Sequence, residues 1–210
     1  MKSYKHIIFD IDGTLIDTEY AIIHSLIKTM TEITENVPQY ENLRFALGIP
    51  GKDALELLKI PDIEEGLKKW DANMKLYNHT IQPFQGIREC LDFLLLKKCI
   101  LGIVTSKTYM EYYSDFKPLG LADYFTTVVC ADDTIEHKPH AAPLLAYLAK
   151  ANINPEDAAY IGDSVYDIQS ATAANMTSGL AMWGNPFISD CKADYYFKTP
   201  NDICKALFPK

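Results

Sequence analysis

Two aspartates, Asp10 and Asp12, directly follow a short apolar run at residues 7–9. Side chains alternate along an extended chain, so both carboxylates point the same way while Ile11 points into the core. Two carboxylates about 4 Å apart repel each other by roughly 4 kcal/mol at the effective dielectric of a protein surface. A hard divalent cation such as Mg2+ would offset this repulsion and still bind water or phosphate oxygens. The pair therefore predicts a Mg2+ site.

Polar side chains also follow three later apolar runs of the sequence. Ligands of an open parallel sheet bind beyond the carboxyl ends of its strands, so we expect these polar groups to converge with the two aspartates. They are Thr105, Ser106 and Lys107 after the second run, Lys138 after the third, and Asp163 and Asp167 after the fourth.

This combination of side chains suits phosphoryl transfer. That reaction needs a nucleophile in line with the phosphorus, cations on the phosphoryl oxygens and an acid for the leaving oxygen. We expect Asp10, held ionised by the metal, to attack the phosphorus. Asp12, farther from the metal, would act as general acid and then as general base toward water, which typically contributes on the order of 10²- to 10⁴-fold in rate.

Short apolar runs that alternate with helical segments predict the elements that position these residues. Ile87, Leu91 and Leu94, for example, share one helical face before the second run. Strands that alternate with helices of this length indicate an α/β fold, with a parallel sheet covered on both sides. The predicted strands are residues 7–9, 100–104, 125–130, 158–161 and 178–182.

Residues 16–81 interrupt this alternation. They contain two helical apolar stripes, one from Ile22 to Ile33 and one from Ile63 to Ile81, and no strand pattern. We therefore predict an α/β core domain formed by residues 1–15 and 82–210, with an all-helical cap domain of residues 16–81 inserted into it. The cap residues expected to set specificity are Glu19, Tyr20, Arg44 and Lys52.

The composition, 48% hydrophobic and 23% charged, is that of a globular protein. A net charge of -8 should repel nucleic acid and anionic membranes, so neither is an expected partner. Five cysteines without a CxxC pair predict free thiols in a reducing compartment, with neither a disulfide framework nor a zinc site. No apolar run has the length of a signal-peptide core or of a membrane span. We expect a cytoplasmic monomer or homodimer that binds a small phosphorylated metabolite.

Four short motifs occur in a fixed order along the chain: FDIDGTL, TSK, KP and GDSVYD. In this order they resemble the four motifs of the haloacid dehalogenase superfamily. The helical insert directly after the first motif is similar to the helical-cap branch, which includes phosphoglycolate phosphatases. The resemblance covers nearly the whole chain and implies a Rossmann-like core with a helical cap.

The resemblance also implies a role for each catalytic residue. Asp10 would be the nucleophile that forms an aspartyl-phosphate, and Asp12 the general acid and base. The Thr105 hydroxyl and the Ser106 backbone amide would bind the phosphate. Lys138 would hold the nucleophile and the transferring group. The presence of Asp12 argues against the dehalogenases that name the superfamily, because they lack this second aspartate.

The metal ligands implied by the resemblance surround one Mg2+ ion. Asp10 and Asp163 would bind it through their carboxylates, and Asp12 through its main-chain carbonyl. Asp167 would lie near or behind the metal.

Structural interpretations of the same residues remain open. Thr105 and Ser106 could cap the helix that follows them. Asp167 lies three residues after a serine, which fits a capping box. Lys138 could be an ordinary surface lysine, and Lys107 either meets the substrate or is solvated.

Several functions share these motifs. A Mg2+-dependent phosphatase acting on a small phosphate monoester, with phosphoglycolate as the leading substrate, is the function that the resemblance favours. A pyrophosphatase is an alternative. A sugar-phosphate phosphomutase is another, and it would need a second phosphate site in the cap. A non-catalytic binding module is the least favoured, because the set of Asp10, Asp12, Lys138 and Asp163 is intact.

Overall fold

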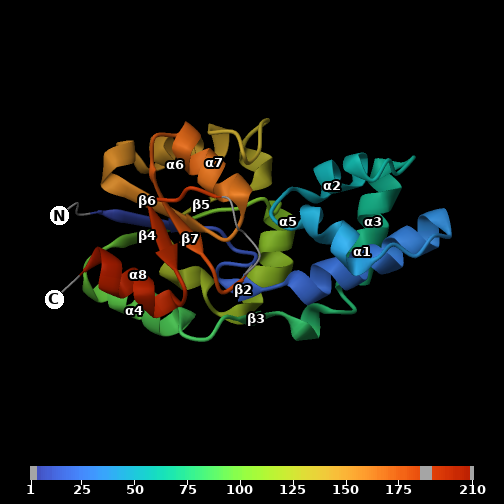
Figure 1. The fold of residues 1–210 in the computed structure, drawn as a ribbon, viewed down its shortest axis with the longest axis horizontal. Coiled ribbons are helices and arrows are strands. Elements are labelled where there is room, and N and C mark those ends of the chain that lie inside the picture. Colours follow the sequence, from blue (N-terminus) through green and yellow to red (C-terminus); the bar gives the residue numbers. More distant parts are fainter. Residues whose placement is uncertain (1–3, 185–190, 209–210) are drawn as a thin grey trace.

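Six parallel strands form the central sheet of the protein, whose computed structural model describes residues 4–184 and 191–208 (Figure 1). The strands are β1 (His6–Phe9), β4 (Ile100–Val104), β5 (Thr127–Val129), β6 (Ala158–Gly162), β7 (Thr177–Ala181) and β8 (Tyr195–Phe197). Their order in the sheet is β5-β4-β1-β6-β7-β8, so β1 lies at the centre between β4 and β6. The prediction of an α/β fold with a parallel sheet is confirmed, and β8 is an additional edge strand that the sequence pattern did not predict.

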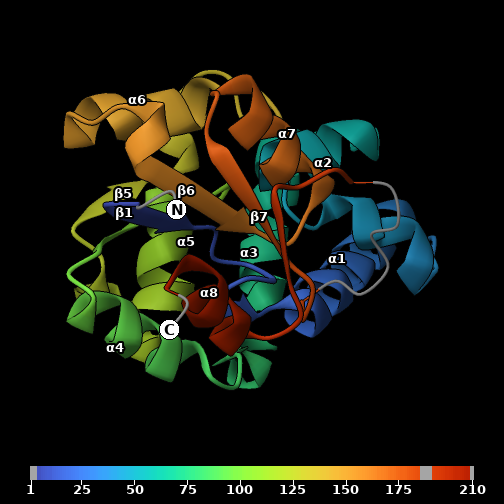
Figure 2. The same ribbon diagram turned by 60° about the vertical axis from the view of Figure 1, so that its left-hand side comes forward.

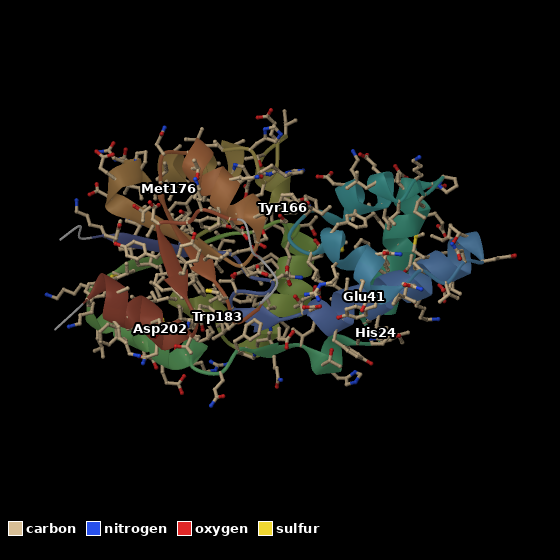
Figure 3. The ribbon with its side chains drawn as sticks, viewed as in Figure 1. His24, Glu41, Tyr166, Met176, Trp183 and Asp202 are labelled. Atoms are coloured by element: carbon tan, nitrogen blue, oxygen red, sulfur yellow. The ribbon has the colours of Figure 1, made fainter. Side chains whose placement is uncertain are left out.

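Helices cover both faces of this sheet, as Figures 1 and 2 show from two directions. Alternate residues of β1 face opposite sides, so Ile7 and Phe9 pack in one apolar cluster and Ile8 packs in the other. The first cluster lies under α4 (Ile87–Leu96) and α8 (Pro200–Leu207). The second lies under α6 (Ala142–Ala151) and α7 (Val165–Ala173), and includes Met176, which Figure 3 labels.

A separate group of helices, here called the helical bundle, lies beyond one end of the sheet (Figure 1). It consists of α1 (Glu19–Thr34), a 3-10 helix (Tyr40–Ala46), α2 (Gly51–Leu57) and α3 (Ile63–Met74). The bundle has its own apolar core, which includes Leu26, Leu43, Leu55 and Trp70. Asp62 caps α3, because its carboxylate accepts a hydrogen bond from the Glu65 backbone. The division of the chain into core and cap domains at residues 16 and 81 stays a prediction.

The second apolar stripe of the sequence does not form one continuous helix. Helix α3 ends at Met74, and a further 3-10 helix (Asn78–Thr80) follows after a turn. Ile81, the last residue of the stripe, is buried in the apolar cluster of the sheet rather than in the bundle. The apolar residues of this stripe thus share one regular spacing but pack in two different cores, the bundle and the sheet. Sequence periodicity alone does not reveal this change.

Two short strands join the chain segments that connect the bundle to the sheet. β2 (Ile16–Asp17) pairs antiparallel with β3 (Gln82–Pro83), although no strand was predicted within residues 16–81. Trp183, labelled in Figure 3, follows β7, and its ring nitrogen donates to the main-chain carbonyl of Thr14 at 2.9 Å. This bond ties the chain just before β2 to the segment that follows β7.

The remaining helices are short. They are α5 (Tyr109–Glu111), a π-helical turn (Tyr112–Phe116), and 3-10 helices at Lys117–Leu119, Ala122–Tyr124, Ala131–Asp133 and Pro155–Asp157. Among the described residues, no helix combines the length and apolar character needed to cross a membrane.

Candidate active site

Side chains from four strand ends meet at one edge of the sheet. Asp10 follows β1, Thr105 follows β4, Lys138 lies in the loop after β5, and Asp163 follows β6. Parallel strands present their carboxyl ends on the same edge, which is why residues far apart in the sequence converge here. All four side chains are buried.

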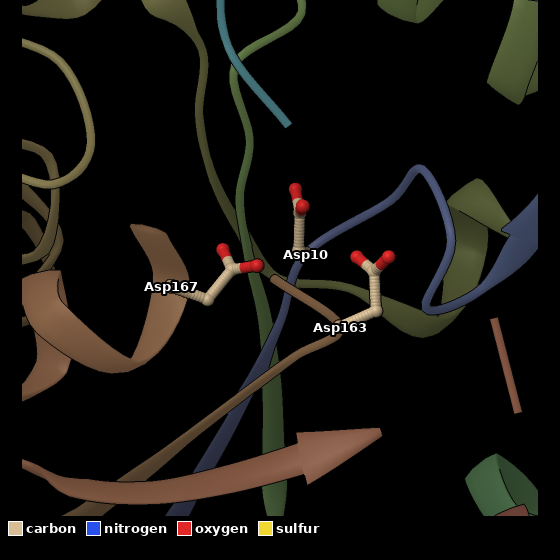
Figure 4. A group of neighbouring side chains, drawn as sticks. All are labelled: Asp10, Asp163 and Asp167. Atoms are coloured by element: carbon tan, nitrogen blue, oxygen red, sulfur yellow. The ribbon is translucent and has the colours of Figure 1, made fainter. Parts of the chain in front are cut away.

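Three carboxylates form the acidic centre of this site. Oxygen atoms of Asp10, Asp163 and Asp167 all lie within 4.8 Å of one another. Figure 4 shows the three side chains directed toward a common space. The Asp12 side chain is not a member of this group, and its expected contribution through the main-chain carbonyl stays a prediction.

Burial and mutual repulsion make the charged forms of two of these carboxylates unfavourable. Burial, reinforced by the charges of Asp167 and Asp12, raises the pKa of Asp10 to about 7, although Lys138 opposes this rise. Burial and the charges of Asp167 and Asp10 likewise raise the pKa of Asp163 well above its ordinary value. The Oδ1 atom of Asp10 is buried and has no hydrogen-bond partner among the described residues. A hard cation bound by oxygen ligands would compensate these buried carboxylate charges.

Glycine at position 13 lets the chain after Asp12 lie close to the Asp163 carboxylate. Gly13 has a φ of 71°, and a Cβ atom there would overlap the Asp163 carboxylate. The Thr14 hydroxyl donates to Asp163 Oδ1 at 3.4 Å. The glycine of the first motif is thus required both by backbone conformation and by space.

Lys138 is the central cation of the site and not a surface lysine. Its ammonium group lies 3.0 Å from Asp10 Oδ2 and donates to Asp167 Oδ1 at 2.8 Å. It also donates to the Tyr160 hydroxyl at 3.2 Å. Although burial opposes the charge, Asp10 and Asp167 raise the pKa of Lys138, so the ammonium form is retained. Tyr160 is a site residue that the sequence did not indicate, because it lies inside the apolar strand β6.

Asp167 carries out the capping role that the sequence left open. Its Oδ2 atom accepts hydrogen bonds from the Ser164 backbone at 3.0 Å and the Ser164 hydroxyl at 2.6 Å, which completes a capping box at the start of α7. Its Oδ1 atom binds Lys138 and the Tyr160 hydroxyl. Burial disfavours the charge, but Lys138 and the hydrogen bonds from Lys138 and Ser164 lower the pKa of Asp167. Both oxygens are therefore engaged by the protein.

Lys107 is buried and paired, so the solvated interpretation of this residue is wrong. Its ammonium group lies 3.2 Å from Asp12 Oδ1 and donates to Asp115 Oδ2 at 3.2 Å. Although burial opposes the charge, Asp12, Asp115 and Glu111 raise the pKa of Lys107. Asp115 lies in the π-helical turn, and sequence reasoning missed it because a separation of eight residues from Lys107 matches no helical pairing rule.

The two hydroxyl residues after β4 do not cap the next helix. Thr108 caps α5, with Glu111 completing a capping box. The Thr105 hydroxyl instead accepts a hydrogen bond from the Lys107 backbone at 3.2 Å. The Ser106 hydroxyl donates to the Gly48 carbonyl of the helical bundle at 2.9 Å, so this residue links the sheet edge to the bundle.

A cavity of about 200 Å3 lies between the sheet edge and the helical bundle. Asp10 and Asp12 line it on the side of the sheet. Most of its apolar lining comes from the bundle, through Ile22, Ala46, Ile49, Leu67, Trp70 and Met74, and Met110 of α5 adds to it. The cavity is large enough for a small metabolite, which would contact the two aspartates there.

None of the four residues expected to set specificity lines this cavity. Arg44 forms an ion pair with Glu19 at 3.2 Å, and Lys52 lies 3.8 Å from Glu56 on an exposed face of α2. Their role in specificity stays a prediction that the lining of this cavity does not support. The bends of the bundle that they flank contribute backbone and apolar side chains to it instead.

The chain is similar to known hydrolases along most of its length. A family model of haloacid dehalogenase-like hydrolases matches residues 7–181. A phosphoglycolate phosphatase of Xylella fastidiosa is 31% identical over 190 residues, which cover 86% of this chain and 81% of that protein. The pyrophosphatase PpaX of Oceanobacillus iheyensis is 27% identical over 205 residues, covering 96% of this chain and 95% of that protein.

A crystal structure from Lactobacillus plantarum, described as that of a candidate phosphoglycolate phosphatase, has the same fold. It is 30% identical, with a TM-score of 0.89, and the match covers 98% of this chain and 100% of that one. The resemblance of the four motifs, the Rossmann-like fold and the prediction of a hydrolase of the phosphatase kind are confirmed by these comparisons. The chain belongs to the haloacid dehalogenase-like hydrolase family.

Proposed function

We propose that the protein is a Mg2+-dependent phosphatase that hydrolyses the phosphate monoester of a small metabolite through an aspartyl-phosphate on Asp10. The observation that carries the proposal is the Asp10 carboxylate, buried between Lys138 and the other two acids, with one unpartnered oxygen and a cavity beside it. The names of the relatives, phosphoglycolate phosphatase and pyrophosphatase, support the same class of reaction.

Mg2+ is the cation that suits the acidic centre. Asp10 and Asp163 would hold it, since burial leaves their charges poorly compensated by the protein. We assign Asp167 a supporting position behind the metal, because Lys138, Tyr160 and Ser164 already occupy its oxygens. When bound, the ion neutralises charge on the acids and on the phosphoryl oxygens.

The first chemical step transfers the phosphoryl group to Asp10. An Asp10 oxygen attacks the phosphorus and forms a P–O bond as the ester P–O bond breaks. Lys138, 3.0 Å from Asp10 Oδ2, holds the carboxylate in place and balances its charge. Asp12 donates its proton to the leaving oxygen, and the alcohol departs into the cavity. The Thr105 hydroxyl and the Ser106 amide bind the phosphoryl oxygens, as the resemblance implies.

The second step hydrolyses the intermediate. Asp12, now ionised, takes a proton from a water molecule whose oxygen attacks the phosphorus. The bond between phosphorus and Asp10 breaks, inorganic phosphate leaves, and both aspartates regain their starting state. Lys107 fixes Asp12 at the edge of the cavity for both proton transfers, since its ammonium group lies 3.2 Å from Asp12 Oδ1.

The helical bundle would act as the cap that closes the site. Closure excludes bulk water while the ester reacts, and the cap must relax to admit the hydrolytic water. The hydrogen bond from Ser106 to the Gly48 carbonyl supports a closed arrangement of bundle and sheet.

Hydrolysis is favoured over phosphomutase activity by the charges in the cavity. A mutase needs a second phosphate site in the cap, with several cations. The bundle contributes one lysine, Lys75, to the described cavity lining, together with the acidic Asp71. Phosphoglycolate is the first substrate to test by resemblance, and pyrophosphate is the second.

A phosphate-release assay with Mg2+ tests the proposal. Purified protein should release phosphate from p-nitrophenyl phosphate and from some members of a panel of metabolite monoesters, and EDTA should abolish the release. Asp10→Asn should be inactive, whereas Lys52→Met, changed on an exposed face outside the cavity, should retain activity. Activity in Asp10→Asn, or no release from any ester by the wild-type protein, would refute the proposal.

A further inference from the structure

The lining of the cavity is acidic even apart from the two aspartates of the first motif. Beyond Asp10 and Asp12, three carboxylates line it: Asp71 from α3, and Glu111 and Asp115 from the segment after β4. Two cations, Lys75 and Lys107, also line it. The balance of these charges decides which leaving groups the cavity accepts.

Lys107 is not available to a ligand. Its ammonium group lies between Asp12 and Asp115, 3.2 Å from an oxygen of each, so its charge is already compensated. Glu111 accepts hydrogen bonds from the Thr108 backbone and hydroxyl, at 2.6 Å and 2.7 Å, so the protein engages one of its two oxygens. The described lining of the cavity therefore carries more acidic than basic side chains.

Asp71 is the carboxylate best placed to meet a ligand. Its carboxylate makes no hydrogen bond or ion pair within the described part of the chain, although its main-chain carbonyl accepts a bond from the Lys75 backbone. Burial, with the charges of Glu111 and Asp115, raises the pKa of Asp71 even though Lys75 is nearby. A positive group in the cavity would relieve this repulsion, and a second negative group would increase it.

A second observation marks the same cavity as a ligand site. Asp10, which is 2% exposed, presents there a buried oxygen without a hydrogen-bond partner. The wall opposite is apolar, with Leu67, Trp70 and Met74 contributed by α3. A ligand that fills the cavity would thus contact Asp10, the apolar side chains of α3 and Asp71.

We propose that the cavity selects phosphate monoesters of amino alcohols, whose leaving group carries a positive charge, over esters whose leaving group carries a carboxylate or a second phosphate. The inference rests on the proposed function and names its substrate class. Asp115 is paired with Lys107, so an ammonium group would lie near Asp71 and Glu111. The carboxylate of phosphoglycolate would meet the same two acids, with Lys75 as the one cation of the described lining that is not already paired with Asp12 and Asp115.

Two esters of similar size test this charge preference directly. Ethanolamine phosphate and phosphoglycolate are compared as competitive inhibitors of p-nitrophenyl phosphate hydrolysis, so that binding is measured whether or not either ester is turned over. We expect ethanolamine phosphate to compete at a concentration about fivefold lower than phosphoglycolate, as about one charge–charge interaction at a partly exposed site would give. Equal competition, stronger competition by phosphoglycolate, or competition by neither ester would overturn the inference.

Matched variants in α3 and at its C-terminal cap, Lys75, test which residues cause the preference for a positively charged leaving group. Asp71→Asn should reduce the ratio of the two inhibition constants about threefold, and Lys75→Met should increase it about threefold. Glu64→Gln, an exposed change on the same helix outside the cavity, should leave the ratio unchanged. A ratio that neither Asp71→Asn nor Lys75→Met alters would also overturn the inference. If the wild-type protein with Mg2+ does not hydrolyse p-nitrophenyl phosphate at all, the proposed function itself fails.

Discussion

Replacing Asp10 by asparagine should abolish turnover and also stabilise the metal-free protein. Burial, assisted by the charges of Asp167 and Asp12, raises the pKa of Asp10 from 3.8 to about 7. The folded state therefore binds a proton more tightly than the unfolded chain does. Asp10 favours folding below its unfolded pKa, and this contribution is lost as the pH rises through the folded value. Asparagine cannot ionise and escapes the loss, while its amide oxygen can still accept a hydrogen bond from Lys138.

The size of the effect follows from the shift of the pKa. A rise of about 3 units, at roughly 1.4 kcal/mol for each unit, makes ionised Asp10 cost about 4 kcal/mol of unfolding free energy above about pH 7. At about pH 4.5 folded Asp10 is protonated, and the remaining cost of about 1 kcal/mol is the free energy that the unfolded carboxyl gains by ionising. The stability gained by Asp10→Asn should thus grow by about 3 kcal/mol between these two conditions.

Urea unfolding in EDTA, followed by circular dichroism at about pH 4.5 and about pH 8, measures this difference. Asp123→Asn, at an exposed position in the 3-10 helix Ala122–Tyr124, serves as the control and should change stability little at either pH. Addition of Mg2+ at the higher pH should stabilise the wild-type protein more than the variant, because the cation compensates Asp10. If Asp10→Asn is no more stable than the wild type at the higher pH, the buried charge is not the destabilising element we describe.

Three further substitutions test the surroundings of the acidic centre. Tyr160→Phe removes the hydroxyl that accepts a hydrogen bond from Lys138. In steady-state kinetics this variant should show kcat lowered about tenfold with little change in KM. An unchanged kcat would contradict this expectation. Gly13→Ala would place a methyl group against the Asp163 carboxylate. It should raise the Mg2+ concentration for half-maximal activity about tenfold or more. An unchanged Mg2+ requirement would mean that the metal does not bind at Asp163. Lys107→Met leaves two carboxylates without their cation and should lower the unfolding free energy by about 3 kcal/mol or more in urea titrations; a smaller loss would mean that they find other partners.

The positions of the central site residues could be predicted because they follow from topology. Asp10, Lys138 and Asp163 lie at or after the ends of buried strands, and a parallel sheet brings those ends to one edge. The helical bundle could also be predicted, since its apolar stripes are long enough to show a helical period. Neighbouring carboxylates at the strand ends repel each other, and this repulsion predicts a cation bound between them.

The partners of these residues could not be predicted from the sequence. Tyr160 looks like any other core residue of an apolar strand, and its hydroxyl reaches the site only through the packing of β6 against β1. Asp115 lies in a π-helical turn, whose spacing differs from that of an α-helix. The strands β2 and β3 each contain two residues, too few to show any alternation.

The antiparallel pair formed by β2 and β3 limits how the helical bundle can reorient. Ile16 pairs with Pro83 and Asp17 with Gln82, so the chain enters and leaves the bundle through one hydrogen-bonded ribbon. If the bundle opens as the proposed cap, both connections would bend together, which favours a pivot about one axis over sliding along the sheet edge. Such a pivot would leave the ribbon intact but break the bond between Ser106 and the Gly48 carbonyl. In the proposed function, product release and the entry of a new ester would then be coupled to the loss of one hydrogen bond.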